Sequence, residues 1–482
     1  MSDPCLLPAI DLATMIRDRK ISPSELLAAY SARIEKFNPA LNAIVQFDSE
    51  RAQETARAAD DIIASGNETP PLFGLPCTIK DAFEVSGMVS TGGIPNLKEH
   101  MPARDADVVA RVRKAGANII GKTNVPFASG DFQSFNDIYG CTNNPYDLER
   151  TPGGSSGGAA AAVVAGMTAF ETGSDIGGSI RLPAHFCGLF GHKSSYDIVP
   201  MRGHLPPKPG YLAASDLSVA GPLARSARDL PFLLANIAGA TNNAWRLDLP
   251  SARTRNPKNL RVAVWLDEPF TDVDVESAAL IEAAAKALSQ AGAKVDFDAR
   301  PDFTMQEAFV NYALVLYAIV ASDFPAHMRV AMIEAAKSSD PEDISHPTLQ
   351  ARSAALNYAD WLNLNQERAR LQSIWATFFQ SYDVVLCPAA PGPAFAHDHQ
   401  GISKRRLEIN GVKRPYLDIV HWAGLASGSY LPASVAPVGQ TKSGLPVGVQ
   451  IIGPWLEDHT PMAVAAMLED LIGGFVPAKD FA

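Results

Sequence analysis

Residues 151–181 read TPGGSSGGAAAAVVAGMTAFETGSDIGGSIR, and this stretch of glycine, serine and alanine is the most unusual in the chain. It is not a flexible linker, because the apolar run AAAAVVAG follows GGSSGG directly. Gly153 and Gly158 have the spacing of a phosphate-binding P-loop, but Ala159 and Ala160 stand where that loop needs lysine and a hydroxyl residue. The stretch therefore predicts a compact element that does not bind phosphate.

The same stretch matches the pattern G-x-S-x-G twice, centred on Ser155 and on Ser156. In an α/β-hydrolase this pattern directly follows a buried strand. Here it follows the polar, turn-like segment YDLERTP at residues 146–152, which disfavours that fold. The Ser-x-x-Lys pattern of β-lactamases is absent as well, because no lysine in the stretch follows a serine by three residues.

The second glycine pair lies in Gly173–Ser179, GSDIGGS, where residues without side chains let consecutive backbone N–H groups converge on one point. Converging amides are what an oxyanion hole requires. Ser179 heads the segment SIRLPAHFCG, at an expected helix N-terminus whose dipole favours negative charge. A glycine-rich turn with a helix-capping serine would look the same, so the segment alone leaves both interpretations open.

A nucleophilic serine needs a base. Lys80 stands in the apolar segment GLPCTIKD at residues 74–81, and a lysine inside an apolar strand loses its water. Desolvation lowers the pKa of lysine toward neutrality, which would allow Lys80 to act as the base, whereas a nearby Asp81 would oppose the shift. A surface lysine paired with Asp81 is the alternative interpretation of this segment.

Histidine is the usual base, but none of the ten histidines stands in an evident triad motif. His397-Asp398-His399 resembles a fragment of a metal site, yet it lies in a polar loop with no third ligand nearby in the sequence. No set of histidine, cysteine or carboxylate residues has credible ligand spacing. We therefore expect no metal and no cofactor.

Outside this stretch, short apolar segments alternate with helical patterns. Strands are expected at 74–83, 117–120, 259–266, 294–297, 382–388 and 447–453, and helices from the capping box at Ser22, at 51–65, 107–115 and 275–292, and from about Thr460. The alternation predicts an α/β fold with helices packed on a mixed sheet. Residues 300–380 are mostly helical, and we interpret them as an insertion or cap on one large domain.

The composition excludes several classes of protein. The 482 residues are 47% hydrophobic and 19% charged, which provides a large core and excludes disorder. The net charge of −11 would repel phosphate backbones, so a nucleic-acid partner is not expected. The chain start has no signal-peptide pattern. The longest nearly apolar run, at residues 159–170, is too short to span a membrane. The five cysteines form no CxxC pair, and their spacing fits buried thiols in a reducing cytoplasm better than a disulfide framework. A cytoplasmic protein without a membrane partner is expected.

Taken together, GLPCTIKD, TPGGSSGGAAA and GSDIGGSIRLPAHFCG resemble the amidase signature family, with Ser155 and Ser179 at that family's separation. GKTNVP at 121–126, GPLARSARDL at 221–230 and GLPVGVQIIGP at 444–454 add to the resemblance, which is weakest over 240–380. It implies a single domain over 1–482, a mixed sheet covered by helices, with the signature core at 60–240. Residues 300–380 would then line the substrate pocket.

The resemblance also implies a catalytic triad and its supporting residues. Ser179 would be the nucleophile, Lys80 the base, and Ser155, preceded by a cis peptide bond, the proton relay. The backbone amides of Ile176, Gly177, Gly178 and Ser179 would form the oxyanion hole, and Ser156, Asp175 and Arg181 would support the loop. Ser129, Gly130 and Asp131 would face the substrate.

The family acts on many substrates. An apolar wall of the substrate pocket can be formed by Tyr312, Leu316, Tyr317 and Phe324, although most apolar stripes of this kind belong to the core. We therefore expect a small, largely apolar amide as substrate, with carbamates and esters as chemically equivalent choices. The alternative is the glutaminase subunit of a tRNA-dependent amidotransferase. That branch usually has Arg-Gln-Pro where this chain has Arg181-Leu182-Pro183, which argues against it. The only partner expected is the small-molecule substrate, for a monomer or a homodimer.

Overall fold

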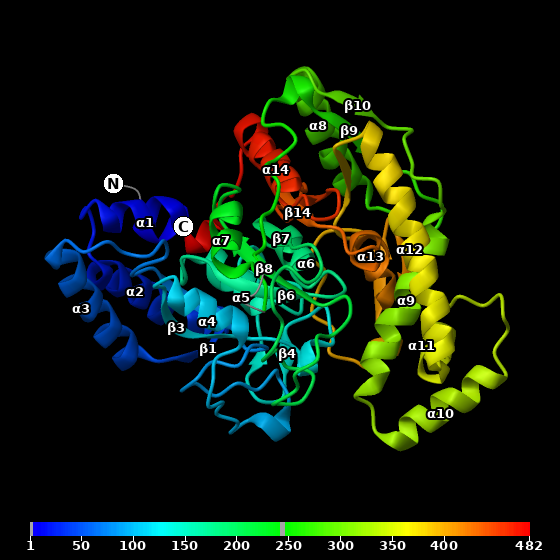
Figure 1. Ribbon diagram of the computed structural model, residues 1–482, viewed down its shortest axis with the longest axis horizontal. Coiled ribbons are helices and arrows are strands. Elements are labelled where there is room, and N and C mark those ends of the chain that lie inside the picture. The colour runs from blue at the N-terminus through cyan, green and yellow to red at the C-terminus, as the bar shows by residue number, and fades with distance from the viewer. Residues whose placement is uncertain (1–2, 242–245) are drawn as a thin grey trace.

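The computed structural model describes residues 3–241 and 246–482, and one mixed sheet of 11 strands runs through them (Figure 1). In spatial order the strands are β1 (Ile44–Phe47), β3 (Asn118–Thr123), β2 (Pro76–Lys80), β6 (Glu171–Asp175), β8 (Val219–Ala224), β7 (Phe190–Lys193), β14 (Ala433–Gln440), β15 (Pro446–Ile452), β11 (Val384–Pro388), β9 (Arg261–Val264) and β10 (Lys294–Asp296). The prediction of an α/β fold with a mixed sheet is confirmed.

The sheet has a parallel group of strands toward each side and antiparallel strands between these two groups, and the edge strand β1 runs antiparallel to β3. β3, β2 and β6 run parallel, as do β11, β9 and β10, while β6, β8, β7, β14, β15 and β11 alternate in direction. Ile79 of β2 lies opposite Thr172 of β6. Because parallel neighbours end at the same edge of a sheet, Lys80 at the end of β2 lies near the turn that follows β6.

Helices cover the sheet on both sides (Figure 1). Their bounds are α1 (Ala9–Arg17), α2 (Pro23–Leu41), α3 (Ser49–Ser65), α4 (Asp107–Lys114), α5 (Gly157–Val164), α6 (Arg181–Phe186), α7 (Asp229–Ile237), α8 (Val275–Gln290), α13 (His421–Gly428) and α14 (His459–Ile472). Local signals set the starts of two of these helices. Ser22 forms the expected capping box of α2, and Asp274 caps α8.

α5 begins directly after the first signature serines, and all eight of its residues are buried. The sequence GGAAAAVV is apolar on every side, as a helix surrounded by protein requires. Its small residues allow close approach to the strands: a methyl group on Gly158 would lie 2.6 Å from the backbone oxygen of Asn124. The signature segment is therefore fixed inside the core rather than displayed on a loop.

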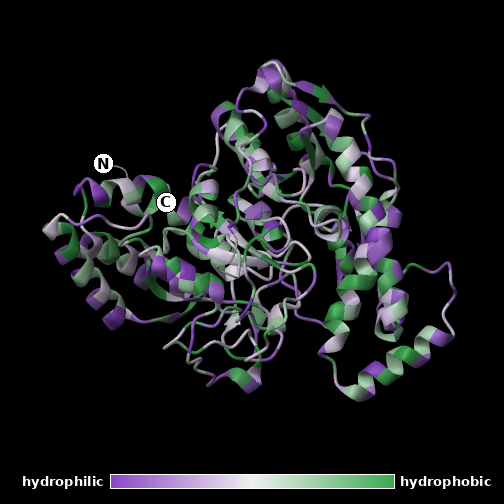
Figure 2. Ribbon diagram, in the orientation of Figure 1, coloured by the Kyte–Doolittle hydropathy of each residue, from purple (hydrophilic) through white to green (hydrophobic). Residues whose placement is uncertain are grey.

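Residues 300–380 are helical, as expected, and lie together on one side of the molecule (Figure 1). They form α9 (Met305–Ser322), α10 (Ala326–Lys337), α11 (His346–Ala355) and α12 (Tyr358–Ser381). Figure 2 shows apolar residues along α9 and polar residues along α12. Among the described residues, α9 is the one helix that is long and apolar enough to cross a membrane. Of its 18 residues, 56% are buried in the protein. The expectation that 159–170 is the longest apolar stretch is therefore wrong.

Two small hairpins lie outside the main sheet: β4 (Phe135–Asn136) with β5 (Gly140–Cys141), and β12 (Arg406–Ile409) with β13 (Val412–Pro415). The strand expected over 74–83 is shorter, at Pro76–Lys80, because Gly74 adopts a positive φ of 74° and a turn begins after Lys80.

The chain forms one domain, as predicted; of the range 1–482, residues 1–2 and 242–245 lie outside the described part. The boundaries 60–240 remain a prediction.

Candidate active site

Lys80 ends β2 and is completely buried. Its Nζ lies 2.6 Å from Ser155 Oγ and 2.9 Å from Ser174 Oγ. The structure thus brings together the lysine and the first signature serine, which are 75 residues apart in the sequence. A buried amine in contact with a hydroxyl is the arrangement that proton transfer requires.

Burial lowers the pKa of Lys80 to about 7, while the carboxylates of Asp175 and Glu171 act in the opposite direction. The alternative of a surface lysine paired with Asp81 is wrong, and Asp81 is not placed to oppose the shift. The carboxylate of Asp81 lies 2.9 Å from Lys122 Nζ and forms a buried ion pair with it. Asp81 therefore does not hold Lys80 in its charged form.

Two other lysines are buried, but neither is placed as Lys80 is. Lys122 is held in its ion pair. Burial also lowers the pKa of Lys193 to about 7, but its Nζ donates to the backbone oxygens of Ser194, at 3.0 Å, and Leu431, at 2.8 Å. Carbonyl oxygens cannot pass on a proton, so of the three only Lys80 combines a lowered pKa with a contact to a signature serine.

Two residues that position Lys80 were not predicted from the sequence: Ser174, which contacts it, and His204, which acts through Ser174. Ser174 Oγ lies between Lys80 and His204, 2.8 Å from His204 Nε2. His204 Nδ1 lies 2.9 Å from the backbone oxygen of Pro206, which can only accept, so Nδ1 carries the proton and Nε2 accepts. Burial lowers the pKa of His204 to about 4, which keeps the ring neutral. No motif marks His204, since its contact with β6 depends on the fold.

This arrangement orients the amine of Lys80. Because the Ser174 hydroxyl donates to His204, its oxygen accepts from Lys80. A second N–H of Lys80 points to the backbone oxygen of Ser174 at 3.4 Å. A neutral amine has two N–H bonds and one lone pair, and the lone pair is then left for the hydroxyl of Ser155.

The two signature serine segments are joined through the backbone. The Gly154–Ser155 peptide bond is cis, as the resemblance implies. Ser156 N donates to the backbone oxygen of Ser179 at 3.2 Å, and Ser156 Oγ donates to that of Ser174 at 3.3 Å. Ser179 keeps 4% of its surface exposed, whereas Ser155 keeps 1% and Ser156 none, so Ser179 is the most accessible of the three.

The turn after β6 carries the backbone amides expected to form the oxyanion hole. The amide of Gly178 is not free, because it donates to the Asp175 carboxylate at 2.9 Å. This corrects the expectation of four donors. Within the described residues, the amides of Ile176, Gly177 and Ser179 take part in no hydrogen bond, so these three are available to a substrate oxygen.

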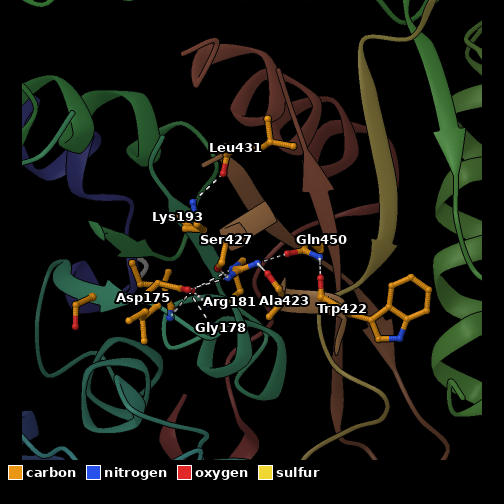
Figure 3. A network of polar contacts seen from close by, with 12 residues as sticks. Asp175, Gly178, Arg181, Lys193, Trp422, Ala423, Ser427, Leu431 and Gln450 are labelled. Atoms are coloured by element: carbon orange, nitrogen blue, oxygen red, sulfur yellow. Dashed lines mark hydrogen bonds and ion pairs between the residues drawn. The ribbon is translucent and has the colours of Figure 1, made fainter. Parts of the chain in front are cut away.

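Asp175 and Arg181 support this turn, as Figure 3 shows. The Asp175 carboxylate accepts from Arg181 Nη2 at 2.8 Å and from the amides of Gly178 and Ile180. Burial alone would raise the pKa of Asp175, but the charge and hydrogen bonds of Arg181 outweigh it and lower the pKa to about 2. The buried ion pair, with no exposed side-chain surface, fixes the backbone that presents the free amides.

Apolar side chains surround Gly177 in the turn. A methyl group placed on Gly177 would lie 3.1 Å from Tyr312 Oη and 3.8 Å from both Phe132 and Val420. The hydroxyl of Tyr312, on α9, donates to the backbone oxygen of Ile176 at 3.1 Å. The expected proximity of Tyr312 to the site is therefore observed, whereas Phe132 and Val420 were not predicted, because a single apolar residue carries no sequence signal for a site.

The three residues expected to face the substrate, Ser129, Gly130 and Asp131, differ in their hydrogen bonds and in their exposure to solvent. Both oxygens of Asp131 are occupied, one by Arg405 Nη1 and the other by Tyr416 Oη, each at 2.6 Å. Ser129 Oγ is buried with no hydrogen-bond partner in the described structure, and Gly130 is exposed. Leu316 and Tyr317 lie in the same apolar cluster as Tyr312, and Phe324, which follows α9, lies outside it.

Comparisons with known proteins identify the family to which the chain belongs. The amidase family matches residues 25–461. The glutamyl-tRNA(Gln) amidotransferase A subunit of Exiguobacterium sibiricum is 33% identical over 501 aligned positions, which cover 97% of this chain and 98% of that protein. The corresponding Acinetobacter baumannii protein is 34% identical, with 96% of both chains covered.

Solved structures give the same result. The present structure matches the crystal structure of an amidase with a TM-score of 0.79 and 27% sequence identity. The match covers 97% of this chain and 100% of that one. A 6-aminohexanoate cyclic dimer hydrolase bound to its substrate has a TM-score of 0.78 and 25% identity, covering 97% and 98%. The fold and the family match define an amidohydrolase. The chain belongs to the amidase signature family.

Proposed function

We propose that this chain hydrolyses amide bonds through an acyl-enzyme on Ser179, with Ser155 as proton relay and Lys80 as base. The observation that carries the proposal is the 2.6 Å contact between Lys80 Nζ and Ser155 Oγ. Ser179 Oγ forms a bond to the amide carbon while its proton passes to Ser155, whose own proton passes to Lys80. Lys80 thereby becomes an ammonium ion.

The remaining steps return that proton. The C–N bond breaks as the leaving amine takes a proton from Ser155, which is replaced from Lys80. Water then attacks the acyl carbon and gives its proton to the same relay, and the acid leaves as Ser179 is restored. The amides of Ile176, Gly177 and Ser179 would stabilise the oxygen anion that forms in both attacks, a contribution of about 2.7–4 kcal/mol per donor in similar sites.

The substrate class follows from the side chains around the turn. Phe132, Tyr312 and Val420 are the side chains nearest to Gly177, and the charge of Asp131 is balanced by Arg405. These contacts favour an apolar acyl or aryl group over a charged amino acid, since an unpaired charge would lose its water without compensation. Carbamates and esters have the same acyl-transfer geometry and belong to the proposed range.

The glutaminase subunit of a tRNA-dependent amidotransferase is the second candidate. It is favoured by the 33–34% identity to amidotransferase A subunits over nearly the whole chain, which is stronger support from relatives than the first candidate has. Arg181-Leu182-Pro183 and the segment GHLPPKPGY at 203–211 depart from the pattern usual in that branch. The balanced charges near the turn also argue for an uncharged substrate.

One experiment separates the candidates. The purified chain, with no other protein present, is assayed on anilides, aliphatic amides, carbamates, nitrophenyl esters and glutamine, and release of the amine, ammonia or nitrophenol is measured. We expect turnover of apolar amides at least about 10-fold above that of glutamine in kcat/KM, a difference of about 1.4 kcal/mol in transition-state binding. Glutamine as the best substrate, with little release from the others, would favour the amidotransferase.

A further inference from the structure

A cysteine and two histidines meet outside the catalytic site. Cys141 lies on β5, and His397 and His399 lie in the loop between β11 and β12. One nitrogen of each histidine and the sulfur of Cys141 all lie within 4.8 Å of one another. The Cys141 sulfur is 3.5 Å from His397 Nδ1.

This cluster corrects the expectation that His397 and His399 have no third ligand nearby. Cys141 stands 256 residues before His397, so no local spacing could connect them. The fold brings the β4–β5 hairpin against the loop. Of the five cysteines, Cys141 is the one that is not buried, and a half-buried thiol remains open to an ion from solvent.

The loop that carries the histidines is held in place by several contacts. The Gln133 side chain donates to the backbone oxygen of Asp398 at 2.8 Å and accepts from its amide at 2.9 Å. The ring of His399 stacks on Phe135, with ring centroids 4.2 Å apart, and Phe135 pairs with Cys141 across the hairpin. Both sides of the cluster are therefore attached to one another before any ligand binds, which lowers the entropic cost of binding.

We propose that Cys141, His397 and His399 bind a divalent ion of the zinc class, with water as the fourth ligand. Thiolate and imidazole are the donors that zinc prefers, at bond lengths of about 2.0–2.3 Å. Tetrahedral geometry at these lengths places ligand atoms about 3.3–3.6 Å apart. The Cys141–His397 separation of 3.5 Å lies in that range. On binding, the thiol of Cys141 releases its proton to solvent.

A second cluster, His346, Asp418 and His421, has its ligand atoms equally close. Both ring nitrogens of His346 are already used, because Nε2 lies 2.9 Å from Asp418 and Nδ1 lies 2.7 Å from the hydroxyl of Tyr317, whereas His421 Nδ1 has no partner in the described structure. It also lacks a sulfur ligand. We therefore assign zinc-class binding to the cluster around Cys141.

The proposed ion lies close to the catalytic segment without belonging to it. Gln133, which holds the histidine loop, belongs to the same segment as Asp131, whose backbone oxygen would lie 2.5 Å from a methyl group on Gly154. A bound ion would therefore fasten the loop to the hairpin that directly follows the segment packed against Gly154. None of its three ligands is a residue assigned to the hydrolytic reaction, so the inference does not depend on the proposed function.

The test uses the full chain after dialysis against a chelator. Co²⁺ is added as a spectroscopic probe, and Zn²⁺ is then used to displace it. We expect one equivalent of Co²⁺ to produce a thiolate-to-cobalt charge-transfer band, and one equivalent of Zn²⁺ to remove it. Cys141→Ser should abolish the band, and His399→Asn, at an exposed position, should weaken Zn²⁺ binding by at least about 10-fold.

Two variants serve as controls. Cys387→Ser changes a buried thiol whose polar neighbour is Gln450, and it should leave both titrations unchanged. His346→Gln changes the second cluster and should leave Zn²⁺ affinity unchanged. The inference is overturned if wild-type protein gives no charge-transfer band, if Cys141→Ser binds Zn²⁺ as tightly as wild type, or if His346→Gln alone abolishes binding. Circular dichroism confirms that each variant is folded.

Discussion

At the scale of single residues, the candidate chemistry depends on whether an amine can be neutral. An ordinary lysine loses its proton near pH ~10.4, and burial lowers the pKa of Lys80 to about 7. The lowered pKa makes a neutral amine beside Ser155 accessible near neutral pH. The carboxylate next to it in the sequence, Asp81, would counteract this shift if it were not paired with Lys122.

Ser179→Ala should remove both hydrolysis and covalent labelling by a fluorophosphonate, because Ser179 is the serine that follows the free amides of the turn. The measurement is mass spectrometry of the labelled protein together with amide turnover. Thermal unfolding should change little, since the substitution removes one small hydroxyl group. Ser155→Ala should slow labelling strongly but leave some. Labelling of wild type at Ser155 or Ser156 would show that the nucleophile is misassigned.

Lys80→Met should lose most activity and the pH dependence with it, since methionine keeps the volume but cannot accept a proton. In wild type the base acts only when neutral, so kcat/KM should rise as pH increases through the pKa of Lys80, about 7, and level off above it. The pH profile of kcat/KM measures this. A rise centred near about pH 4–5 would instead indicate a carboxylate base and contradict the mechanism.

Ser174→Ala should shift the pH profile as well as lower the rate. Ser174 Oγ accepts a hydrogen bond from Lys80, which favours the charged amine, so its loss should lower the apparent pKa. The lone pair of Lys80 would also be less well oriented, and we expect kcat/KM to fall by about 10-fold. Ser174→Thr should restore both properties.

The control for this prediction is Ser194→Ala, which removes a buried hydroxyl that donates to the backbone of Ala220 and not to Lys80. It should leave the pH profile unchanged. An unchanged profile in Ser174→Ala as well would mean that Ser174 and His204 do not orient the amine.

At the scale of elements, the turn between β6 and α6 is fixed by a side chain that reaches three other segments. Arg181 binds Asp175 at the end of β6, donates to the backbone oxygen of Ala423 on α13 at 2.8 Å, and donates to Gln450 on β15 at 2.5 Å (Figure 3). The turn carries the candidate oxyanion donors, so their positions depend on how α13 and β15 pack.

Arg181→Met should destabilise the protein by about 3–5 kcal/mol, because it leaves the buried carboxylate of Asp175 without its partner. Urea unfolding measures the change. The pKa of Asp175 is lowered to about 2, so the contribution of the pair is fully present at neutral pH, begins to be lost as pH falls below the ordinary aspartate pKa of about 3.9, and is gone below about 2.

Arg228→Met is the matched control, because Arg228 forms an exposed ion pair with Asp11 at 2.8 Å. Exposed pairs contribute about 0–1 kcal/mol. Equal losses in the two variants would show that burial of the Asp175–Arg181 pair does not determine its contribution.

At the scale of the whole molecule, residues from separate parts of the chain meet around one turn. β2 contributes Lys80, the signature stretch contributes the serines, and α9 contributes Tyr312, whose hydroxyl binds the turn itself. The helical segment 300–380 is thus attached directly to the candidate oxyanion hole. The expectation that residues 300–380 line the substrate pocket stays a prediction, which this contact of Tyr312 favours.

Chelators should leave hydrolysis unchanged, because every group in the proposed mechanism is a side chain or a backbone amide. The measurement is amide turnover before and after dialysis against EDTA, with metal content determined in parallel. Dialysis should empty the site proposed at Cys141 without affecting the rate constant by more than about 2-fold. Loss of turnover that a metal ion restores would show that the catalytic assignment is wrong.

The sequence by itself determined the fold class, the family and the candidate triad. Alternating apolar segments predicted the mixed sheet, and the capping residues Ser22 and Asp274 predicted two helix starts, because these signals act over a few residues. The signature motifs identified Lys80, Ser155 and Ser179, because each motif fixes its own local backbone.

Only the tertiary structure decided which groups surround the triad. It paired Asp81 with Lys122, placed His204 behind Ser174, and directed the Gly178 amide to Asp175. It also brought Cys141 to the two histidines. These contacts join residues whose partners are set by strand order and helix packing, and a buried charge or donor takes whichever partner the fold places beside it. The linear sequence pattern does not specify which partner a buried charge or donor will have.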